Sequence, residues 1–174
     1  QDMVLGLYYM TKGRKSTKEK PVIGEGIKFY SAEEVRIAFN ENKVNLNAII
    51  HCKVDVKENG EIVNKLIETT VGRVLFNEAT PKSVGYINEV LTKKALRNII
   101  GRILKETDVP TTSKFLDDIK GLGYYMAFKG GLSFSLSDII IPKEKESMVA
   151  EASSKVGEIL DNYSMGLITN KERY

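Results

Sequence analysis

The sequence of 174 residues contains few of the side chains from which many functional sites are built. It has one cysteine, Cys52, and one histidine, His51. A single cysteine excludes an internal disulfide framework and is typical of a reducing compartment. Two such residues are too few for a structural zinc site. Because neighbours on a strand point to opposite faces, they are also not expected to form a catalytic Cys–His pair.

Long apolar runs and a strong excess of one charge are also missing. The longest wholly apolar runs hold only a few residues, such as 139–141, far fewer than the roughly 20 of a membrane-spanning helix. No secretory or transit signal is visible, and we expect no membrane association. Lys and Arg number 26 against 23 Asp and Glu, so any contact with nucleic acid should be local. Hydrophobic residues make up 42% and charged residues 28%, which is typical of a soluble globular protein.

Known catalytic motifs are not found either. The stretches "GEG" and "KGG" complete neither a Walker nor a Rossmann phosphate loop, and turn glycines explain them better. Asp117 and Asp118 are adjacent on an expected helix and face different sides, which suits a solvated surface better than paired acid–base work. No nucleophile with a matching base is apparent. Residue chemistry alone therefore predicts a non-catalytic α+β domain.

The first half of the chain mixes strand and helix patterns. The opening "QDMVLGLYYMTKG" predicts a buried strand through residues 5–10, followed by a mobile basic loop at residues 12–24. Ser31 and Glu34 form the pattern of a capping box at the start of a short helix. Apolar residues alternate from Ile50 to Val56 and resume at Ile62, with Asn59 and Gly60 between them. This pattern predicts a β-hairpin.

The second half is mainly helical. An amphipathic helix is expected around residues 93–105, with an apolar stripe on one side and a basic face that includes Lys93, Lys94 and Arg97. Such a face serves either as a solvated surface or as a phosphate contact. A second helical pattern follows in "SKFLDDIKGLGYYMAFKGG". The alternation of Leu132, Phe134 and Leu136 then predicts a strand.

A long helix is expected over residues 143–165, with Pro142 suited to its first turn and Gly166 to its end. Its apolar residues recur at alternating spacings of three and four, the seam of a coiled coil: Val149, Ala152, Val156, Ile159 and Tyr163. The seam packs either on the protein's own core or on a partner helix. Both ends of the chain look cut, so we expect a piece of a longer protein.

Together these patterns predict an α+β fold with a small mixed or antiparallel β portion that contains a hairpin, several helices, and a long C-terminal helix that is half of a coiled-coil hairpin. Five stretches also resemble one family: "QDMVLGLYYMT", "ETTVGRVLF", "INEVLTKKAL", "SFSLSDIIIPKEKE" and "GLITNKERY". In this order and at similar intervals they are similar to the central part of the bacterial RNA polymerase beta-prime subunit, immediately downstream of its catalytic aspartate loop. The resemblance covers nearly the whole chain apart from residues 12–24 and the hairpin tip.

The resemblance implies a fragment of a DNA-directed RNA polymerase, a nucleotidyltransferase. The family's motif Asn-Ala-Asp-Phe-Asp-Gly-Asp, which holds the catalytic magnesium ions of the parent enzyme, does not occur in these residues. The fragment is therefore expected to be inactive, with no catalytic residue, metal site or cofactor of its own. Its implied partners are the beta, alpha, omega and sigma subunits, the DNA template and the RNA transcript. The implied location is the cytoplasm, at the nucleoid.

The resemblance also implies two regions with different roles. Residues 1–142 would be the pore domain, which lines the secondary channel for nucleotide entry and for backtracked RNA, and Lys93, Lys94 and Arg97 are candidates to face phosphates there. Residues 143–174 would be the first rim helix and its hairpin tip, the start of the funnel region. At this tip, Asn170, Lys171 and Glu172 are candidates for docking Gre-type secondary-channel factors.

A third site of the family is expected to survive only as a remnant. Some members bind the alarmone ppGpp through Lys, Ile, Asp and Tyr at positions that align with Pro110, Lys114, Asp117 and Gly121, so only Asp117 is retained. The alternative to the polymerase interpretation is a free-standing α+β interaction module. Such a module would bind nucleic acid or an acidic partner through the basic helix from Lys93 to Lys105.

Overall fold

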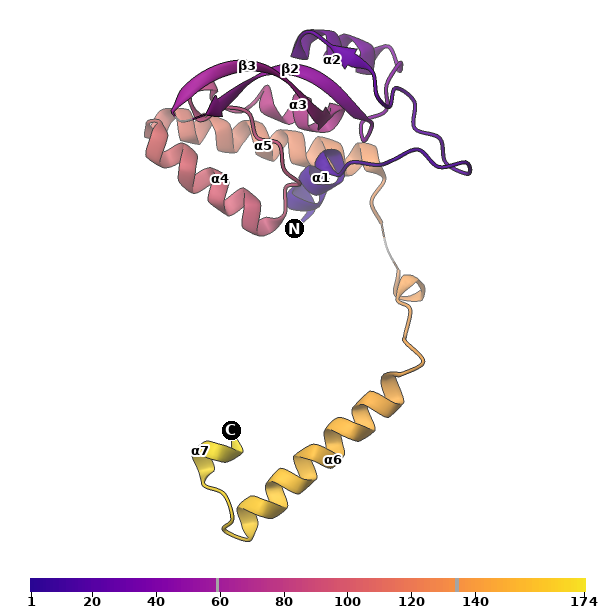
Figure 1. Ribbon diagram of the computed structural model, residues 1–174, viewed down its shortest axis with the longest axis vertical. Coiled ribbons are helices and arrows are strands. Elements are labelled where there is room, and N and C mark those ends of the chain that lie inside the picture. Colours follow the sequence, from indigo (N-terminus) through magenta and orange to yellow (C-terminus); the bar gives the residue numbers. More distant parts are fainter. Residues whose placement is uncertain (59, 134) are drawn as a thin grey trace. The chain divides into compact units, whose positions relative to one another are not determined.

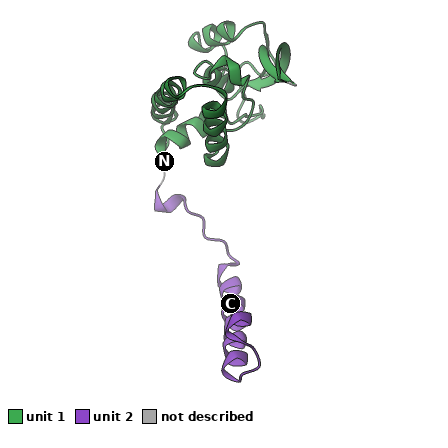
Figure 2. Cartoon of the chain, turned by 90° about the vertical axis from the view of Figure 1, so that its left-hand side faces the viewer, with its two compact units in different colours: residues 1–132 green, residues 133–174 purple. Residues whose placement is uncertain are grey.

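The computed structural model describes residues 1–58, 60–133 and 135–174. It confirms an α+β fold with a small sheet (Figure 1). The chain divides into two compact units, Gln1–Leu132 and Ser133–Tyr174 (Figure 2). The first unit contains α1 (Asp2–Thr11), β1 (Lys28–Phe29), α2 (Ala32–Asn40), β2 (Ile49–Glu58), β3 (Glu61–Thr70), α3 (Val71–Asn77), the short 3-10 helix η1 (Lys82–Val84), α4 (Lys93–Glu106) and α5 (Val109–Gly130).

The three strands form a mixed sheet in the order β1-β2-β3. β2 and β3 pair antiparallel in one unbroken register, from Ile49 opposite Thr70 to Glu58 opposite Glu61. The hairpin expected from the alternation is therefore confirmed. Gly60 adopts a φ of 90°, which an L-residue rarely takes, while Asn59 lies outside the described residues. β1 adds two residues in parallel, opposite His51 and Cys52.

The opening segment is a helix, so the strand predicted over residues 5–10 is wrong. The buried positions of α1 are Gly6, Leu7, Met10 and Thr11, the spacing of one helix face rather than of a strand. A short apolar run does not distinguish a buried strand from a buried helix. Packing against α5 decides between them in this fold.

The crossing of α1 and α5 depends on two glycines. A Cβ at Gly6 would overlap the carbonyl oxygen of Gly123 and lie 2.8 Å from the backbone nitrogen of Ala127. A Cβ at Gly123 would lie 2.6 Å from both Cγ and the carbonyl oxygen of Met3. Because the obstacles are mostly backbone atoms, the two helices approach this closely only where side chains are absent.

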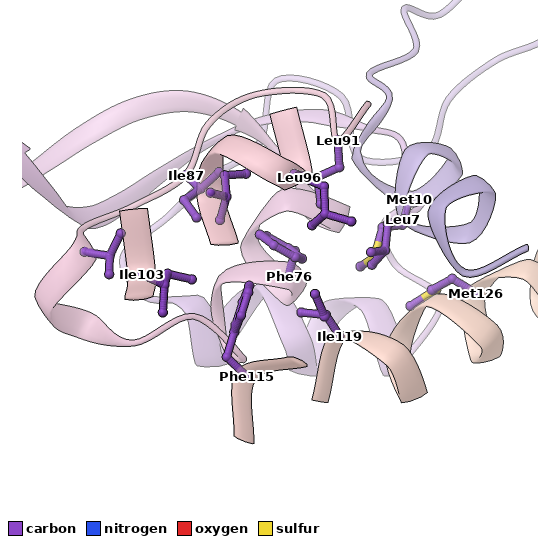
Figure 3. Packing of buried hydrophobic residues seen from close by; sticks show 12 residues of the cluster. Leu7, Met10, Phe76, Ile87, Leu91, Leu96, Ile103, Phe115, Ile119 and Met126 are labelled. Carbon is purple, nitrogen blue, oxygen red and sulfur yellow. The ribbon is translucent and has the colours of Figure 1, made fainter. Parts of the chain in front are cut away.

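The first unit is built around two hydrophobic clusters. The first joins α1, α3, α4 and α5 and is drawn in Figure 3, where the rings of Phe76 and Phe115 meet edge to face with centroids 6.3 Å apart. The second lies between the sheet and helices α2 and α3, and includes Val35, Ile50 and Val74. Such clusters of fully buried apolar side chains supply most of the free energy that stabilises a fold.

Two local features of the first half differ in detail from the expected pattern. Ser31 caps α2 by accepting a hydrogen bond from the Glu34 nitrogen at 3.2 Å, but the Glu34 carboxylate accepts from the backbone nitrogen of Tyr30 rather than from that of Ser31. The basic loop contains neither helix nor strand, as expected. It is nevertheless anchored, because Val22 packs into the second cluster and the backbone nitrogen of Arg14 donates to the Asn47 carbonyl oxygen at 2.8 Å.

The second unit contains the short 3-10 helix η2 (Leu136–Asp138), α6 (Lys145–Ser164) and α7 (Asn170–Arg173). The strand expected at Leu132, Phe134 and Leu136 is wrong for the described residues on either side of Phe134, which itself lies outside them. Leu136 begins η2 instead. The long helix is confirmed, although it starts two residues later than expected, beyond Pro142. No described helix combines the length and the apolar character needed to cross a membrane.

Candidate functional surfaces

The amphipathic helix expected around residues 93–105 is α4, and its basic residues lie on the exposed side. Leu96, Ile99 and Ile103 are buried in the first cluster, whereas the five cations of α4 are exposed: Lys93, Lys94, Arg97, Arg102 and Lys105. Among the described residues, none of these cations takes part in an ion pair. The exposed side of α4 therefore carries five cations that have no ion-pair partner in the described residues, and we call it the α4 basic face.

The α4 basic face has two further unusual properties. Lys93 and Lys94 occupy the first two helical positions, and no acidic residue lies in the first turn, although the positive end of a helix dipole disfavours cations there. Gly101 lies among the basic residues with no atom within 4 Å of where its Cβ would be. An interior helical glycine costs about 1 kcal/mol relative to alanine. Because nothing lies close to Gly101, no packing contact within the described part of the chain offsets this cost.

The three residues proposed for the tip of the second unit are brought together in α7 and are all exposed. Glu172 forms a capping box with Thr169, because its Oε2 accepts hydrogen bonds from the nitrogen and from Oγ1 of Thr169, both at 2.8 Å. These bonds hold the pKa of the Glu172 carboxyl below its usual range. Asn170 Oδ1 accepts from Arg173 at 2.9 Å, and Lys171 forms no ion pair in the described residues.

The tip is attached to α6 through an aromatic contact. The Arg173 guanidinium lies over the Tyr163 ring at 4.9 Å from its centroid, within the range of a cation–π interaction. Gly166, with a φ of 74°, lets the chain turn after α6. The apolar seam of α6 is largely exposed, from Val149 at 55% to Tyr163 at 40%. Within the described second unit, α7 lies beside its later part, at Val156, Ile159 and Tyr163, and a coiled coil stays a prediction.

Asp117 lies on the exposed surface of α5 and is already paired. Its Oδ1 accepts from Lys120 Nζ at 2.7 Å, and this hydrogen bond lowers the pKa of the Asp117 carboxyl. Asp118 pairs separately with Lys114. The two adjacent carboxylates therefore serve different ion pairs, as the expectation of a solvated surface implies.

No metal centre or reactive thiol emerges in the described part of the chain. Groups of three or more side chains able to hold a metal ion are absent there. Cys52 is fully buried on the core side of β2. Burial, and to a lesser extent Glu34, raise the pKa of its thiol from 9.0 to about 11, so the nucleophilic thiolate is disfavoured. His51, its neighbour, belongs to the opposite face of the sheet.

The described first unit contains an open groove of about 670 Å³. It lies beside β2 and is bordered by Tyr30, Lys53, Glu78 and Tyr86, with Thr80 at its wall. Thr80 is only 8% exposed, and its hydroxyl has no hydrogen-bond partner in the described residues. Sequence reasoning did not identify this groove, because its borders come from five separate segments.

A polar network that the sequence did not reveal joins α1, β3 and α3. Arg73 Nε donates to the Thr11 carbonyl oxygen, and Nη1 donates to Asn88 Oδ1, both at 3.0 Å. Asn88 in turn accepts from Thr69 at 2.9 Å and donates to the Glu68 carbonyl oxygen at 2.9 Å. The Thr11 hydroxyl accepts from the Leu91 nitrogen at 2.9 Å. The network fixes residues 86–91 against the end of α1.

Comparison with known proteins identifies the family. The sequence model of RNA polymerase Rpb1, domain 3, matches residues 1–139. Over the full chain, the sequence is 62% identical to the DNA-directed RNA polymerase subunit beta' of Karelsulcia muelleri (strain GWSS) and 60% identical to that of Flavobacterium psychrophilum. It is also 55% identical to the corresponding subunit of Bacteroides fragilis. In each case the chain spans 12% of the relative's length. The chain therefore belongs to the family of bacterial DNA-directed RNA polymerase beta' subunits.

Proposed function

We propose that this chain acts in DNA-templated RNA synthesis as the part of a beta' subunit that lines the secondary channel and offers a rim for transcription factors. The observation that carries the proposal is the similarity of the whole chain to beta' subunits, which are named as RNA polymerase components. Other polymerase subunits, template DNA and the RNA transcript are then its partners. Catalysis depends on magnesium held by residues outside this chain.

The α4 basic face is the candidate channel lining. Its cations lie along one side of one helix, and Lys93 and Arg97 are four residues apart, which corresponds to about 6 Å along the helix axis. Uncompensated cations raise the local concentration of anions such as nucleoside triphosphates and RNA. The open space beside Gly101 would let a phosphate group approach the helix backbone without a steric obstacle.

The test replaces Lys93, Lys94 and Arg97 with glutamine in the complete polymerase. We expect the apparent KM for nucleotides to rise severalfold at low salt, with a smaller difference at high salt because salt screens the interaction. The matched control removes three cations that already have carboxylate partners, Lys65, Lys114 and Lys120. Equal effects of the two triple variants, or no effect of either, would remove the channel role.

The rim tip is the candidate docking surface for Gre-type factors. Glu172 is exposed and ionised over a wide pH range, and a carboxylate suits a basic partner surface with salt-sensitive association. Because Glu172 also caps α7, a lysine at this position would remove a structural contact together with the charge. Glu172→Gln is the sharper variant, since the amide oxygen retains an acceptor for Thr169.

The expected result for Glu172→Gln is weaker factor-stimulated transcript cleavage by the complete polymerase, most clearly at low salt. Glu158→Gln on α6 is the control, because it removes one exposed carboxylate that forms no ion pair in the described residues. Unchanged factor affinity for Glu172→Gln across a range of salt would exclude a docking role. Lys171→Gln and Asn170→Ala extend the same test to the rest of the tip.

The isolated chain should be catalytically inactive, because the aspartate motif that holds magnesium in the family is absent from its sequence. Magnesium-dependent nucleotide addition by the purified chain would contradict this.

We further propose that Asp117 does not sustain a ppGpp site. Its carboxylate is engaged by Lys120, and an alanine at Asp117 in the complete polymerase should leave the response to ppGpp unchanged.

A further inference from the structure

Arg73 is held in one orientation by neutral acceptors. Its Nε donates to the last carbonyl oxygen of α1, that of Thr11, and its Nη1 donates to Asn88 Oδ1. Asn88 is fixed in turn by the hydroxyl of Thr69 and by the backbone of β3. A guanidinium carries five N–H donors, of which these bonds use two. Nη2 makes no hydrogen bond to any described residue.

No carboxylate in the described part of the chain forms an ion pair with this guanidinium. Arg73 is half-buried, and none of the ion pairs there involves it. Burial lowers the pKa of Arg73, and the nearby Tyr86 and Glu89 oppose that shift only in part. An arginine that is partly removed from water usually pairs with a carboxylate or a phosphate. By contrast, the exposed Arg36 on α2 forms an ion pair with Glu78 at 3.9 Å.

We propose that Arg73 is a binding site for a carboxylate side chain that comes from polymerase sequence outside these 174 residues. The fork formed by Nη2 and the remaining Nη1 hydrogen is oriented in advance, so little side-chain entropy is lost when the carboxylate binds. This site is separate from the α4 basic face and from the tip. It rests on membership of the beta' family and not on the channel role.

A single carboxylate fits the surroundings better than a nucleic-acid strand. Glu89 lies close enough to Arg73 to affect its titration, and its negative charge opposes the several phosphates of a strand more than the single charge of one carboxylate. Nucleic-acid contacts also usually gather several exposed cations, whereas Arg73 is a single cation in a partly dehydrated position. A phosphate occupant is therefore the alternative outcome of the test.

The first experiment places the photo-crosslinking residue p-benzoylphenylalanine at position 73 of the full-length subunit, assembles the complete polymerase and maps the products by mass spectrometry. The expected result is one polypeptide segment with an aspartate or glutamate within about one helical turn of the crosslink, or roughly four residues. Crosslinks to DNA or RNA, to a segment without an acidic residue, or to no other segment at all would each overturn the proposal.

The second experiment tests the charge without relying on a crosslink at position 73. Arg73→Glu in the complete polymerase should lower the yield of assembled, active enzyme at least fivefold, and lysine in place of the mapped carboxylate should restore most of it. Arg73→Lys, which keeps the charge but loses the fork, should have an intermediate yield. Arg36→Glu is the matched control, and the lysine replacement should not rescue it. Failure of the paired reversal to restore the yield would refute the pairing.

Discussion

Replacing Gly6 with alanine tests whether the first unit depends on close contact between α1 and α5. Alanine would gain up to about 1 kcal/mol of helix propensity. Its Cβ, however, would overlap the backbone of Gly123 and Ala127, which does not rotate away as a side chain would. Overpacking of this kind costs about 1 to 3 kcal/mol, occasionally more. We expect a net loss of stability of up to about 2 kcal/mol.

Gly101→Ala is the matched control, because it changes the same atoms in a helix where nothing lies within 4 Å of the new Cβ. It should raise stability by about 0.5 to 1 kcal/mol. Urea unfolding of the purified chain, followed by near-ultraviolet circular dichroism, measures both variants. Six of the eight tyrosines lie in the first unit, so the signal reports mainly on it. Equal stabilisation by both alanines would refute the glycine-dependent crossing.

Three further predictions concern single groups. Thr11→Val should lower the free energy of unfolding by about 1 to 3 kcal/mol because the buried Leu91 nitrogen loses its acceptor. Urea titration measures this change, and the control Thr17→Val, at an exposed turn, should leave the free energy of unfolding nearly unchanged. Burial raises the pKa of the Cys52 thiol to about 11, so its contribution to the free energy of unfolding should be complete below about pH 9 and lost as the pH rises through 11. A Cys52→Ala variant should lack that part of the loss of stability at alkaline pH. Identical profiles of unfolding free energy against pH for the two proteins would contradict the assignment. Gly166→Ala forces an L-residue to a φ of 74°, about 1 kcal/mol of strain, and should reduce hydrogen-exchange protection in α7, whereas Gly157→Ala should not.

The sequence was sufficient for elements that carry their own local signal. The β2–β3 hairpin, α4 and α6 were predicted because alternation, amphipathic spacing and capping residues lie within each segment. The opening helix was not predicted, since its apolar run is compatible with both secondary structures and the decisive contact, Gly6 against Gly123, joins residues far apart in the sequence.

The candidate sites show the same division. The exposure of Lys93, Lys94 and Arg97 follows from helix periodicity, and the exposed tip follows from the turn at Gly166. The Arg73 network could not be predicted, because its members come from α1, β3, α3 and the loop before α4. Glu172 was identified as an exposed carboxylate, but its capping bonds to Thr169 required the three-dimensional arrangement. Its Thr-x-x-Glu spacing is a signal that could have revealed them.

The glycine crossing has a consequence for synthesis of the protein on the ribosome. The two glycines are 117 residues apart, from position 6 to position 123. At about 5 to 20 residues per second, α1 emerges roughly 6 to 23 s before the helix that covers it. During that interval Leu7 and Met10, which are fully buried in the folded unit, have no α5 to contact. Nascent chains at this stage should therefore be substrates for chaperones that bind apolar segments, and truncation before residue 123 should prolong that binding.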